Sequence, residues 1–511
     1  MNDSKQRKIG VILSYAIIGL NMLVAIFYTP IVTSKLGQSE YGLYQYVKSI
    51  IDYMTLLDLG LGNAIIIFIS RTIKNNDKKE ENKLFTLFFM IYSIVSIIAV
   101  IIGIILLCNV EILFNSTITI EEIQKAKVLL AILVVNIAIS FPGSVFSNTI
   151  NAHENFIFIK ALNIIKIILQ PIILIPLLYL GYGSIVLVLY ATIANLIVIL
   201  INYIYCRKKI KIRFNFEKID KNIFKSIFGF SIWIILKEII DKVNWSLDNF
   251  LLGKISGIVS VSIYSIASQI NHIYIQTSTA ISGVMLPNVT KKNEEKNDNM
   301  KYMNELWIKT GRIQLFIVGL ILSGYIVFGQ QFILLWVGKE YQESYIVGCA
   351  LMIPMIISLI QNVSGSILQA KNKHQFMTII YTIMAVLNVI LSIPLIKKFG
   401  PLGAALGTGI SLVIGNIIIK NIYYYVSIKL DVKNFFKSIL PTMIGQVILG
   451  LVSFIVVSKL SINSWLLLFI GIAIYTIIYS IMIFSLFMNK YEKDLINNLL
   501  YKLKIKRKCK A

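Results

Sequence analysis

The sequence predicts an all-α membrane protein that crosses the bilayer many times. Of its 511 residues, 57% are hydrophobic and only 14% are charged, whereas soluble domains are about 45–50% apolar and about 25% charged. Long apolar runs, each able to cross the hydrocarbon core as a helix of roughly 20 residues, recur along the whole chain. A soluble fold has too little interior to bury this apolar surface, so a bilayer is the predicted environment.

Fourteen apolar runs meet the length that a spanning helix requires. The first is too long for the core of a signal peptide and is interpreted as a retained anchor. In chain order the expected spans are residues 9–34, 42–70, 84–107, 127–150, 160–180, 184–206, 226–252, 256–286, 310–331, 345–369, 376–397, 402–426, 436–458 and 464–488.

The charges between the spans predict the orientation. Of the 49 lysine and arginine residues, 37 fall in segments that this count places in the cytoplasm and 8 in external segments. Such an excess follows the positive-inside rule and predicts that both termini are cytoplasmic. The net charge of +24 therefore reflects orientation and an anionic inner leaflet, and nucleic-acid binding is not expected.

The segments between spans offer no place for catalysis. The longest, 108–126, 207–225 and 287–309, are too short for a folded catalytic domain. The four cysteines lie far apart without metal-ligand spacing, and phosphate-loop and nucleophile motifs are missing from the sequence. We therefore expect no enzyme activity, no cofactor and no metal site.

An internal repeat divides the chain. Residues 33–44 resemble 252–264, Gly143-Ser144-Val145 resembles Gly365-Ser366-Ile367, and Pro176 matches Pro394, at offsets between 218 and 222. Because six spans separate the copies, both enter the membrane from the same side, as in transporters whose two lobes rock about a central site. An old duplication in a channel or scaffold is the alternative.

The repeat and the charges together predict five parts of the chain. They are an N-lobe 1–206, a basic cytoplasmic linker 207–225, a C-lobe 226–426, two appended helices 427–488, and a basic cytoplasmic tail 489–511.

Several motifs carry a resemblance to a known family. The chain reads S-K-L-G-x-x-x-Y-G-L-Y after its first span, D-L-G-L-G-N in its second, and P-L-x-x-x-G-x-x-G-A-A at 394–405. With six plus six plus two spans, it resembles the Wzx-type oligosaccharide-lipid flippases, which are polysaccharide biosynthesis proteins of the MOP superfamily related to the MATE exporters. The resemblance implies a MATE-like fold in the plasma membrane. It also implies a sugar repeat unit on undecaprenyl pyrophosphate as cargo and polysaccharide assembly proteins as candidate partners.

Ionisable side chains inside the spans are candidates for the transport pathway, since they are costly at membrane depth. Lys48 and Asp52 share one face of the second span, where a structural ion pair is the alternative. In the seventh span, polar residues recur every three or four positions and predict a stripe that lines the cleft between the lobes. The alternative is that the first half of this span lies outside the bilayer. Asp58 is interpreted as a buried carboxylate bonded to neighbouring backbone.

A pyrophosphate cargo would require cations, and its sugars would require amide and aromatic side chains. Arg71 and Arg312 are more typical of the basic membrane interface. The candidate cavity cations are Lys48, Lys166, Lys237 and Lys242. Proton or sodium coupling is assigned to Asp52, Glu238, Asp241 and Asp248. The candidate sugar contacts are Asn21, Trp245, Gln269, Asn271 and Gln361.

Two other functions remain open from the sequence. A drug or organic-cation antiporter of the MATE branch would need an acidic central cavity, whereas this chain places lysines beside its acids. A membrane polysaccharide polymerase or glycosyltransferase would need a large loop carrying acid-base groups, and the loops carry none.

Overall fold

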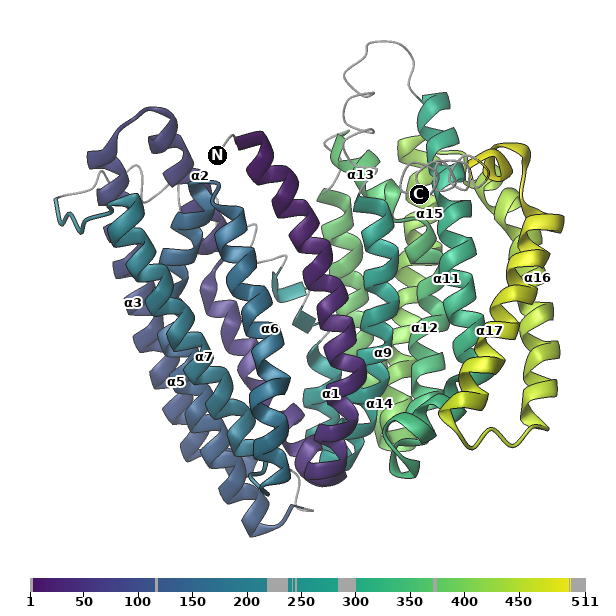
Figure 1. Ribbon diagram of the computed structural model, residues 1–511, viewed down its shortest axis with the longest axis horizontal. Coiled ribbons are helices and arrows are strands. Elements are labelled where there is room, and N and C mark those ends of the chain that lie inside the picture. The colour runs from purple at the N-terminus through teal and green to yellow at the C-terminus, as the bar shows by residue number, and fades with distance from the viewer. Residues whose placement is uncertain are drawn as a thin grey trace, which may run out of the picture. The chain divides into compact units, whose positions relative to one another are not determined.

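The structure is a computed structural model that describes residues 3–114, 118–217, 238–240, 242–243, 246–283, 300–370, 375–495 and 497. Over these ranges every regular element is helical (Figure 1). The chain forms two compact units. The first comprises Met1–Ser265 with Ala385–Gly407, and the second comprises Ile266–Met384 with Thr408–Ala511.

The first unit is built from long helices of the N-terminal half. Helix α1 (Asp3–Met54) is followed by a 3₁₀ turn, Thr55–Asp58, and then by α2 (Leu61–Lys74). The helix is interrupted between them because Leu59 and Gly60 both have left-handed backbone conformations. The helices are α1 (Asp3–Met54), α2 (Leu61–Lys74), α3 (Lys78–Cys108), α4 (Val110–Leu113), α5 (Ile120–Ala152), α6 (Phe156–Tyr179) and α7 (Ser184–Tyr205), and the unit also takes the start of α9 (Ile258–Gly283).

The second unit contains most of the C-terminal half. Its helices are the remainder of α9, then α11 (Met300–Trp336), α12 (Ser344–Ile360), α13 (Val363–Ala370), both ends of α14 (Gln375–Leu412), α15 (Lys420–Tyr423), α16 (Val432–Ser458) and α17 (Trp465–Met482). The middle of α14, Ala385–Gly407, belongs to the first unit. Helix α15 lies between two π-helical segments, Val413–Ile419 and Tyr424–Ile428. A third π-helical segment, Ile483–Phe487, follows α17.

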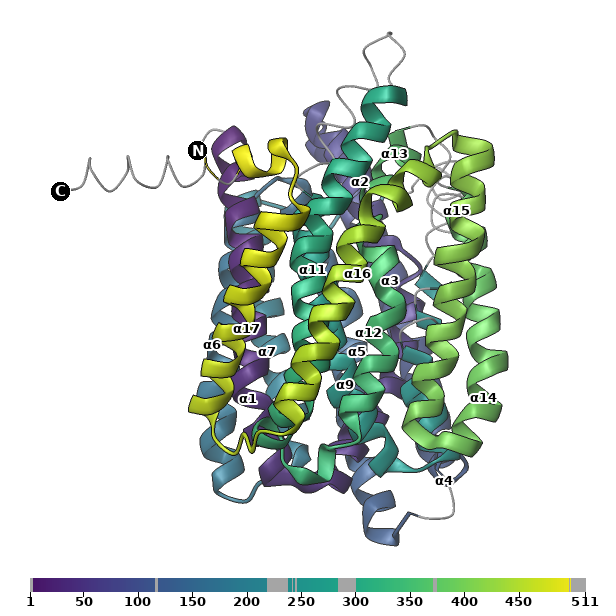
Figure 2. The same ribbon diagram turned by 90° about the vertical axis from the view of Figure 1, so that its right-hand side faces the viewer.

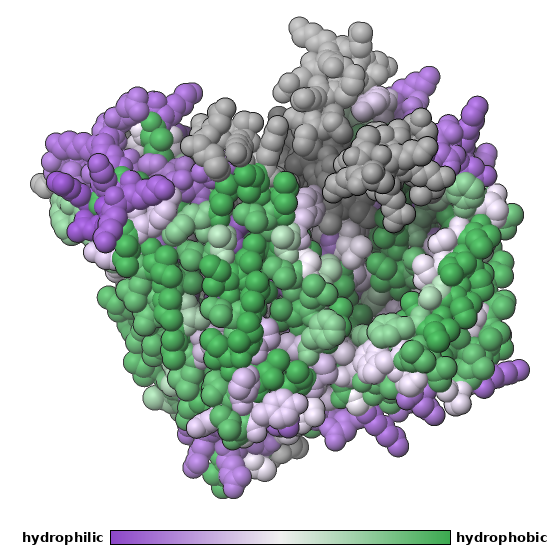
Figure 3. Space-filling view, in the orientation of Figure 1, coloured by the Kyte–Doolittle hydropathy of each residue, from purple (hydrophilic) through white to green (hydrophobic). Residues whose placement is uncertain are grey.

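Nine helical stretches of the described chain are long and apolar enough to cross a membrane. Two of them, Ile12–Lys74 with 63 residues and Phe376–Ile428 with 53, exceed the length of two spans of roughly 20 residues. Over α3, α6 and α7 the visible surface is hydrophobic, with hydrophilic side chains gathered at the ends (Figure 3). The chain is thus built for multiple crossings. The expected count of fourteen stays a prediction, since most of the span 226–252 lies outside the described residues.

Glycines bend the two longest helices. Gly37 has φ 75° inside α1 and Gly400 has φ 56° inside α14, a region that glycine enters readily. Gly257 and Gly181 also have positive φ, at 91° and 87°. Gly37 pairs with Gly257, and Gly181 with Gly400, at the spacing of the predicted repeat. The matched glycines therefore share a left-handed backbone, and the repeat itself stays a prediction.

The acidic residue of the first motif fastens three helices of the first unit. The Glu40 carboxylate accepts a hydrogen bond of 2.5 Å from the Ser184 backbone N–H, at the start of α7. It also accepts one of 2.8 Å from Lys125 Nζ of α5. A carboxylate at a helix N-terminus satisfies a free N–H and opposes the positive end of the helix dipole. This motif residue therefore has a structural role.

Replacing Glu40 with alanine should lower the free energy of unfolding by about 2 kcal/mol, because two charge-assisted hydrogen bonds are lost. Thermal unfolding of the detergent-solubilised protein measures the change. Glu111→Ala is the matched control: that carboxylate is 74% exposed and lies 3.5 Å from Lys127 Nζ, so its removal should be nearly neutral. Equal effects of the two substitutions would contradict the assignment.

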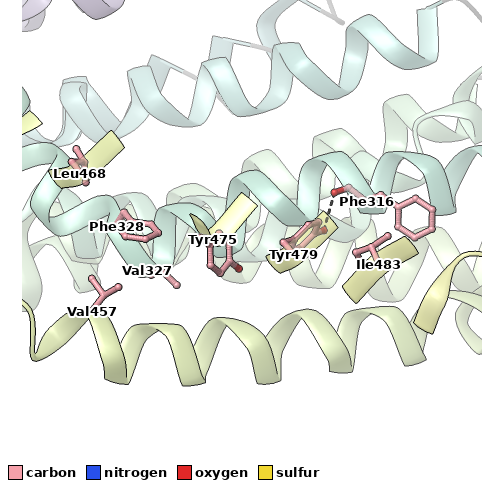
Figure 4. Close-up of a cluster of buried hydrophobic side chains, with 8 residues drawn as sticks. All are labelled: Phe316, Val327, Phe328, Val457, Leu468, Tyr475, Tyr479 and Ile483. Carbon is pink, nitrogen blue, oxygen red and sulfur yellow. Dashed lines mark hydrogen bonds between the residues drawn. The ribbon is translucent and has the colours of Figure 1, made fainter. Parts of the chain in front are cut away.

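The last two long helices pack on α11 through apolar and polar contacts. Views from two sides show α16 and α17 beside α11 (Figures 1 and 2). Tyr479 of α17 donates a hydrogen bond of 2.8 Å to the Phe316 carbonyl (Figure 4). It also accepts one of 2.7 Å from Gln446 Nε2 of α16. The surrounding cluster of buried side chains contains Phe316, Val327, Phe328, Val457, Leu468, Tyr475, Tyr479 and Ile483. The appended pair is thus an integral part of the second unit.

Arg312 of α11 joins the same three parts of the second unit at one end. Its Nε lies 2.6 Å from Glu492 Oε1 and its Nη2 lies 3.0 Å from Oε2. Nη1 donates to the Ser438 carbonyl at 2.5 Å and Nη2 to the Phe487 carbonyl at 2.7 Å. The side chains of Arg312 and Glu492 are only 12% and 3% exposed. Arg312 therefore forms a buried ion pair, whereas the sequence alone suggested a solvated interface charge.

The described start of the basic linker is tied to α3. Lys79 and Lys83 place their ammonium groups 2.9 and 2.7 Å from the two Glu217 carboxylate oxygens. Hydrogen bonds from Lys83 and then Lys79 hold the pKa of Glu217 below its ordinary value. The linker thus begins close to the N-terminal end of α3, and 218–225 lie outside the described residues.

Candidate functional site

A polar pocket lies within the first unit, between α5, α6 and α7. Its volume is about 340 Å³, which falls at the lower end of the range for small-molecule sites, about 300–1,000 Å³. Eight of its thirteen lining residues are serine, asparagine or lysine, an unusual composition for helices that are otherwise apolar. The lining residues are Ser140, Gly143, Ser144, Ser147, Asn151, Ile159, Leu162, Asn163, Lys166, Asn195, Val198, Ile199 and Asn202.

The polar residues of α5 form one line along the helix. Ser140, Ser144, Ser147 and Asn151 follow one another at spacings of four, three and four residues, which is the spacing of one helix face. Each of the three serine hydroxyls donates to a carbonyl of α5 itself, at 2.6, 2.7 and 3.0 Å in chain order. Because their protons are engaged, these hydroxyls offer acceptor oxygens to the pocket.

Two asparagines of α7, seven residues apart, complete the opposite wall. Asn195 Nδ2 donates to Asn136 Oδ1 at 2.8 Å and to Ser140 Oγ at 2.7 Å, which fixes its orientation against α5. Asn202 is 4% exposed, and its Oδ1 has no hydrogen-bond partner within the described part of the chain. A buried acceptor without a donor costs free energy unless a ligand or water supplies one.

Lys166 of α6 is the one lysine or arginine among the pocket's described lining residues, and none of these residues is acidic. Its side chain is partly buried. No carboxylate in the described ranges is within ion-pair distance of its ammonium group. A cation on a membrane-spanning helix, facing a polar pocket without acids, is suited to hold an anionic ligand.

A half-buried carboxylate, that of Asp58, lies beyond the α5 wall of the pocket. Tyr92 of α3, which is fully buried, donates a short hydrogen bond to Asp58 Oδ1. Asp58 also accepts a hydrogen bond from the Gly62 backbone, and Ser144 lies beside the Tyr92 hydroxyl. The expected backbone contact is present, but Asp58 is half-buried and is also bonded to the Tyr92 side chain, which the sequence did not indicate.

The structure brings Lys166 into this pocket, and the other two described candidate cations, Lys48 and Lys242, are not among its lining residues. Lys48 is exposed and Asp52 half-buried on α1, and these two described residues form no ion pair with each other. Lys242 and Glu238 are half-buried. Lys237, Asp241 and Trp245 lie outside the described residues.

The remaining candidates are distributed over both units. Asp248 is 2% exposed and accepts a hydrogen bond of 2.5 Å from Tyr264 OH. Gln361 is fully buried and donates to Asn421 Oδ1 at 2.8 Å. Asn271 is buried, Gln269 is half-buried, and Asn21 is exposed on α1. Their assignment to ion coupling or sugar binding stays a prediction.

Sequence reasoning missed the serines and asparagines of the pocket. A signal was present, since the α5 residues recur at helical spacing inside an apolar run. It also missed a buried cation: Lys420 of α15 is 4% exposed and lies 5.6 Å from the centroid of the Tyr424 ring. The charge count included Lys420 among the cytoplasmic lysines, whereas the structure continues the helix through Lys420 between two π-helical segments.

One protein-family model matches the chain over more than half of its length, from near the N-terminus. The model of the family described as "Polysaccharide biosynthesis protein" matches residues 8–293. A "Putative O-antigen transporter" of Shigella flexneri is 25% identical over 421 residues, covering 78% of this chain and 94% of that protein. A "Probable low-salt glycan biosynthesis flippase Agl15" of Haloferax volcanii is 25% identical over 259 residues, which is 50% of this chain and 53% of that protein.

Solved structures with similar architecture show the fold. The chain is similar to the lipid II flippase MurJ in an inward closed conformation, with a TM-score of 0.71 and 19% identity over 96% of this chain and 99% of that one. It is also similar to an inward-facing multidrug resistance MATE family transporter of the MOP superfamily, with a TM-score of 0.64 and 16% identity over 76% and 90% of the two chains. The predicted MATE-like, all-helical membrane fold is confirmed.

Proposed function

This chain belongs to the polysaccharide biosynthesis protein family, and we propose that it is a non-enzymatic flippase for an oligosaccharide linked to undecaprenyl pyrophosphate. The cargo would move from the inner to the outer leaflet of the plasma membrane. The family match, the O-antigen and glycan relatives and the likeness to a lipid II flippase support this proposal. Both termini would lie in the cytoplasm, as the positive-inside rule indicates.

The proposed mechanism is alternating access between an N-lobe, 1–206, and a C-lobe, 226–426, of fourteen spans in all. A protein that flips a lipid-linked glycan must give its pyrophosphate a polar environment inside the bilayer, because a charge in hydrocarbon costs several kcal/mol or more. We assign that role to cavity cations, with Lys166 as the first candidate and Lys48, Lys237 and Lys242 as further candidates. Proton or sodium coupling through Asp52, Glu238, Asp241 or Asp248 is part of the same proposal.

One observation carries the proposal furthest: Lys166 faces a pocket lined by serines and asparagines, and none of the described lining residues is acidic. Such a pocket would hold an anion that carries hydroxyl groups. A MATE-type antiporter for organic cations would need acidic groups there, so this pocket favours the flippase. Asn21, Trp245, Gln269, Asn271 and Gln361 remain proposed contacts to the sugars.

The test uses a host strain that lacks its own copy of the gene. The intact chain should restore surface polysaccharide, and Lys166→Gln should reduce restoration to about a tenth or less, since one charge-assisted contact is worth about 1.5–3 kcal/mol. Surface polymer is measured by immunoblot, together with lipid-linked repeat units retained inside the cell.

Lys160→Gln is the matched control, because Lys160 is on the same helix and does not line the pocket. It should restore surface polymer fully at equal protein level. Full surface polymer in the strain without any copy would refute the flippase proposal. Full restoration by Lys166→Gln would remove Lys166 from the pathway.

A further inference from the structure

We infer that the pocket between α5, α6 and α7 is a subsite for a single glycosyl phosphate: one sugar ring together with the phosphate bonded to it. The inference rests on the proposed function for the source of this group, which would be the first sugar of the lipid-linked cargo. The chemistry of the subsite follows from the pocket itself, through its charge, its hydrogen-bonding pattern and its size.

The charge of the pocket requires an anion. Lys166 is the cation among the described lining residues, and none of them is a carboxylate that would neutralise it. A lysine held in this setting gains most from a ligand that brings one or two negative oxygens. A neutral sugar would leave the ammonium group uncompensated, and a cationic ligand would be repelled.

The hydrogen-bonding pattern requires donors as well. Three serine hydroxyls give their protons to α5 carbonyls. Ser140 Oγ already accepts from Asn195, so Ser144 and Ser147 are the two that present acceptor oxygens. Asn202 adds a buried Oδ1 that has no donor in the described chain. Inorganic phosphate near neutral pH carries only one or two O–H donors and presents mainly acceptor oxygens to these acceptors. Sugar hydroxyls supply the missing donors. A ligand with an anionic end and hydroxyl groups therefore satisfies both Lys166 of α6 and the acceptor oxygens of α5 and α7.

The size of the pocket limits the ligand to one sugar. A cavity of about 340 Å³ is close to the smallest volumes that small-molecule sites show. It accommodates one ring with its phosphate and excludes an oligosaccharide. The subsite would therefore recognise the end of the glycan nearest the lipid, and the sugars further out would not affect binding at this position.

The experiment measures ligand binding to the purified full chain in nanodiscs. The probes are glucose 1-phosphate, methyl glucoside and inorganic phosphate, each studied by equilibrium dialysis. Glucose 1-phosphate should bind about tenfold or more tightly than either comparison compound, because each of those lacks one of the two sets of contacts. Equal affinity for inorganic phosphate, or for methyl glucoside, would overturn the inference.

Matched variants assign the contacts. Lys166→Gln should lower the affinity for glucose 1-phosphate to that for methyl glucoside, while Lys166→Arg, which keeps the charge and guards against a folding defect, should retain binding. Asn202→Leu should lower the same affinity toward that for inorganic phosphate. Lys160→Gln should bind as the unaltered protein does. Equal losses in Lys160→Gln and Lys166→Gln would contradict a specific role for Lys166.

A final experiment tests whether the ligand is part of the lipid-linked cargo, and it distinguishes failure of the subsite from failure of the proposed function. Glucose joined through pyrophosphate to a ten-carbon prenyl chain should displace glucose 1-phosphate, whereas no displacement would mean that the pocket takes a free sugar phosphate and would overturn the assigned source. Binding that persists in a protein unable to flip lipid-linked glycan would count against the proposed function alone. Normal flipping with no glycosyl phosphate binding would overturn the subsite alone.

Discussion

Arg312→Ala is expected to lower the free energy of unfolding by about 3–5 kcal/mol, because removing one partner of a buried ion pair leaves the other charge uncompensated. Glu492, which is 3% exposed in the unaltered protein, would lose the guanidinium that compensates its charge. The Ser438 and Phe487 carbonyls would each lose a donor as well. Thermal unfolding in detergent measures the loss, and limited proteolysis should show cleavage near 488–495 at lower temperature than in the unaltered protein.

A double replacement and a surface pair provide the controls. Arg312→Met with Glu492→Leu removes both charges and should recover most of the lost stability, as apolar replacement of buried ion pairs often does. Lys309→Ala breaks a pair with Glu305 whose side chains are 43% and 51% exposed, and it should change stability by less than about 0.5 kcal/mol. Similar losses of stability for Arg312→Ala and Lys309→Ala would show that the buried ion pair does not stabilise the second unit.

Hydropathy predicted the helical membrane fold because the bilayer imposes a simple constraint: each span needs a long apolar run with its backbone hydrogen bonds satisfied internally. The same rule could not show where a helix bends or continues. Residues 9–34 and 42–70 were expected as separate spans, and the structure has non-helical backbone at Gly37, between these two ranges. It also has a second break, at Leu59 and Gly60, inside the range expected as the second span. These bends depend on single φ angles, which hydropathy does not report.

Of the residues that line the candidate site, only Lys166 was predicted from the sequence. Lys166 drew attention because an ammonium group in an apolar run is costly, whereas serine and asparagine are common packing residues in membrane helices. The pocket appears only when α5, α6 and α7 are brought together, and that arrangement depends on tertiary contacts. For the same reason the sequence could not pair Arg312 with Glu492, 180 residues away.

Gly42→Ala is expected to lower the free energy of unfolding by about 3 kcal/mol or more. A Cβ on Gly42 would lie 2.0 Å from the Ile258 carbonyl oxygen and 2.8 Å from its carbonyl carbon. Both atoms belong to the backbone at the start of α9, so relief requires one helix to move away from another. Overpacking that can be relieved by side chains costs typically about 1–3 kcal/mol, and a backbone obstacle should reach or exceed the top of that range.

Gly19→Ala in the same helix separates this clash from the general effect of the substitution. A Cβ on Gly19 meets no atom within 4 Å, and alanine favours the helix by about 1 kcal/mol over glycine, so this variant should be as stable as the original or slightly more so. Expression level and melting temperature should fall sharply for Gly42→Ala alone. Equal melting temperatures would mean that the glycine of the Y-G-L-Y motif has a role other than close helix packing.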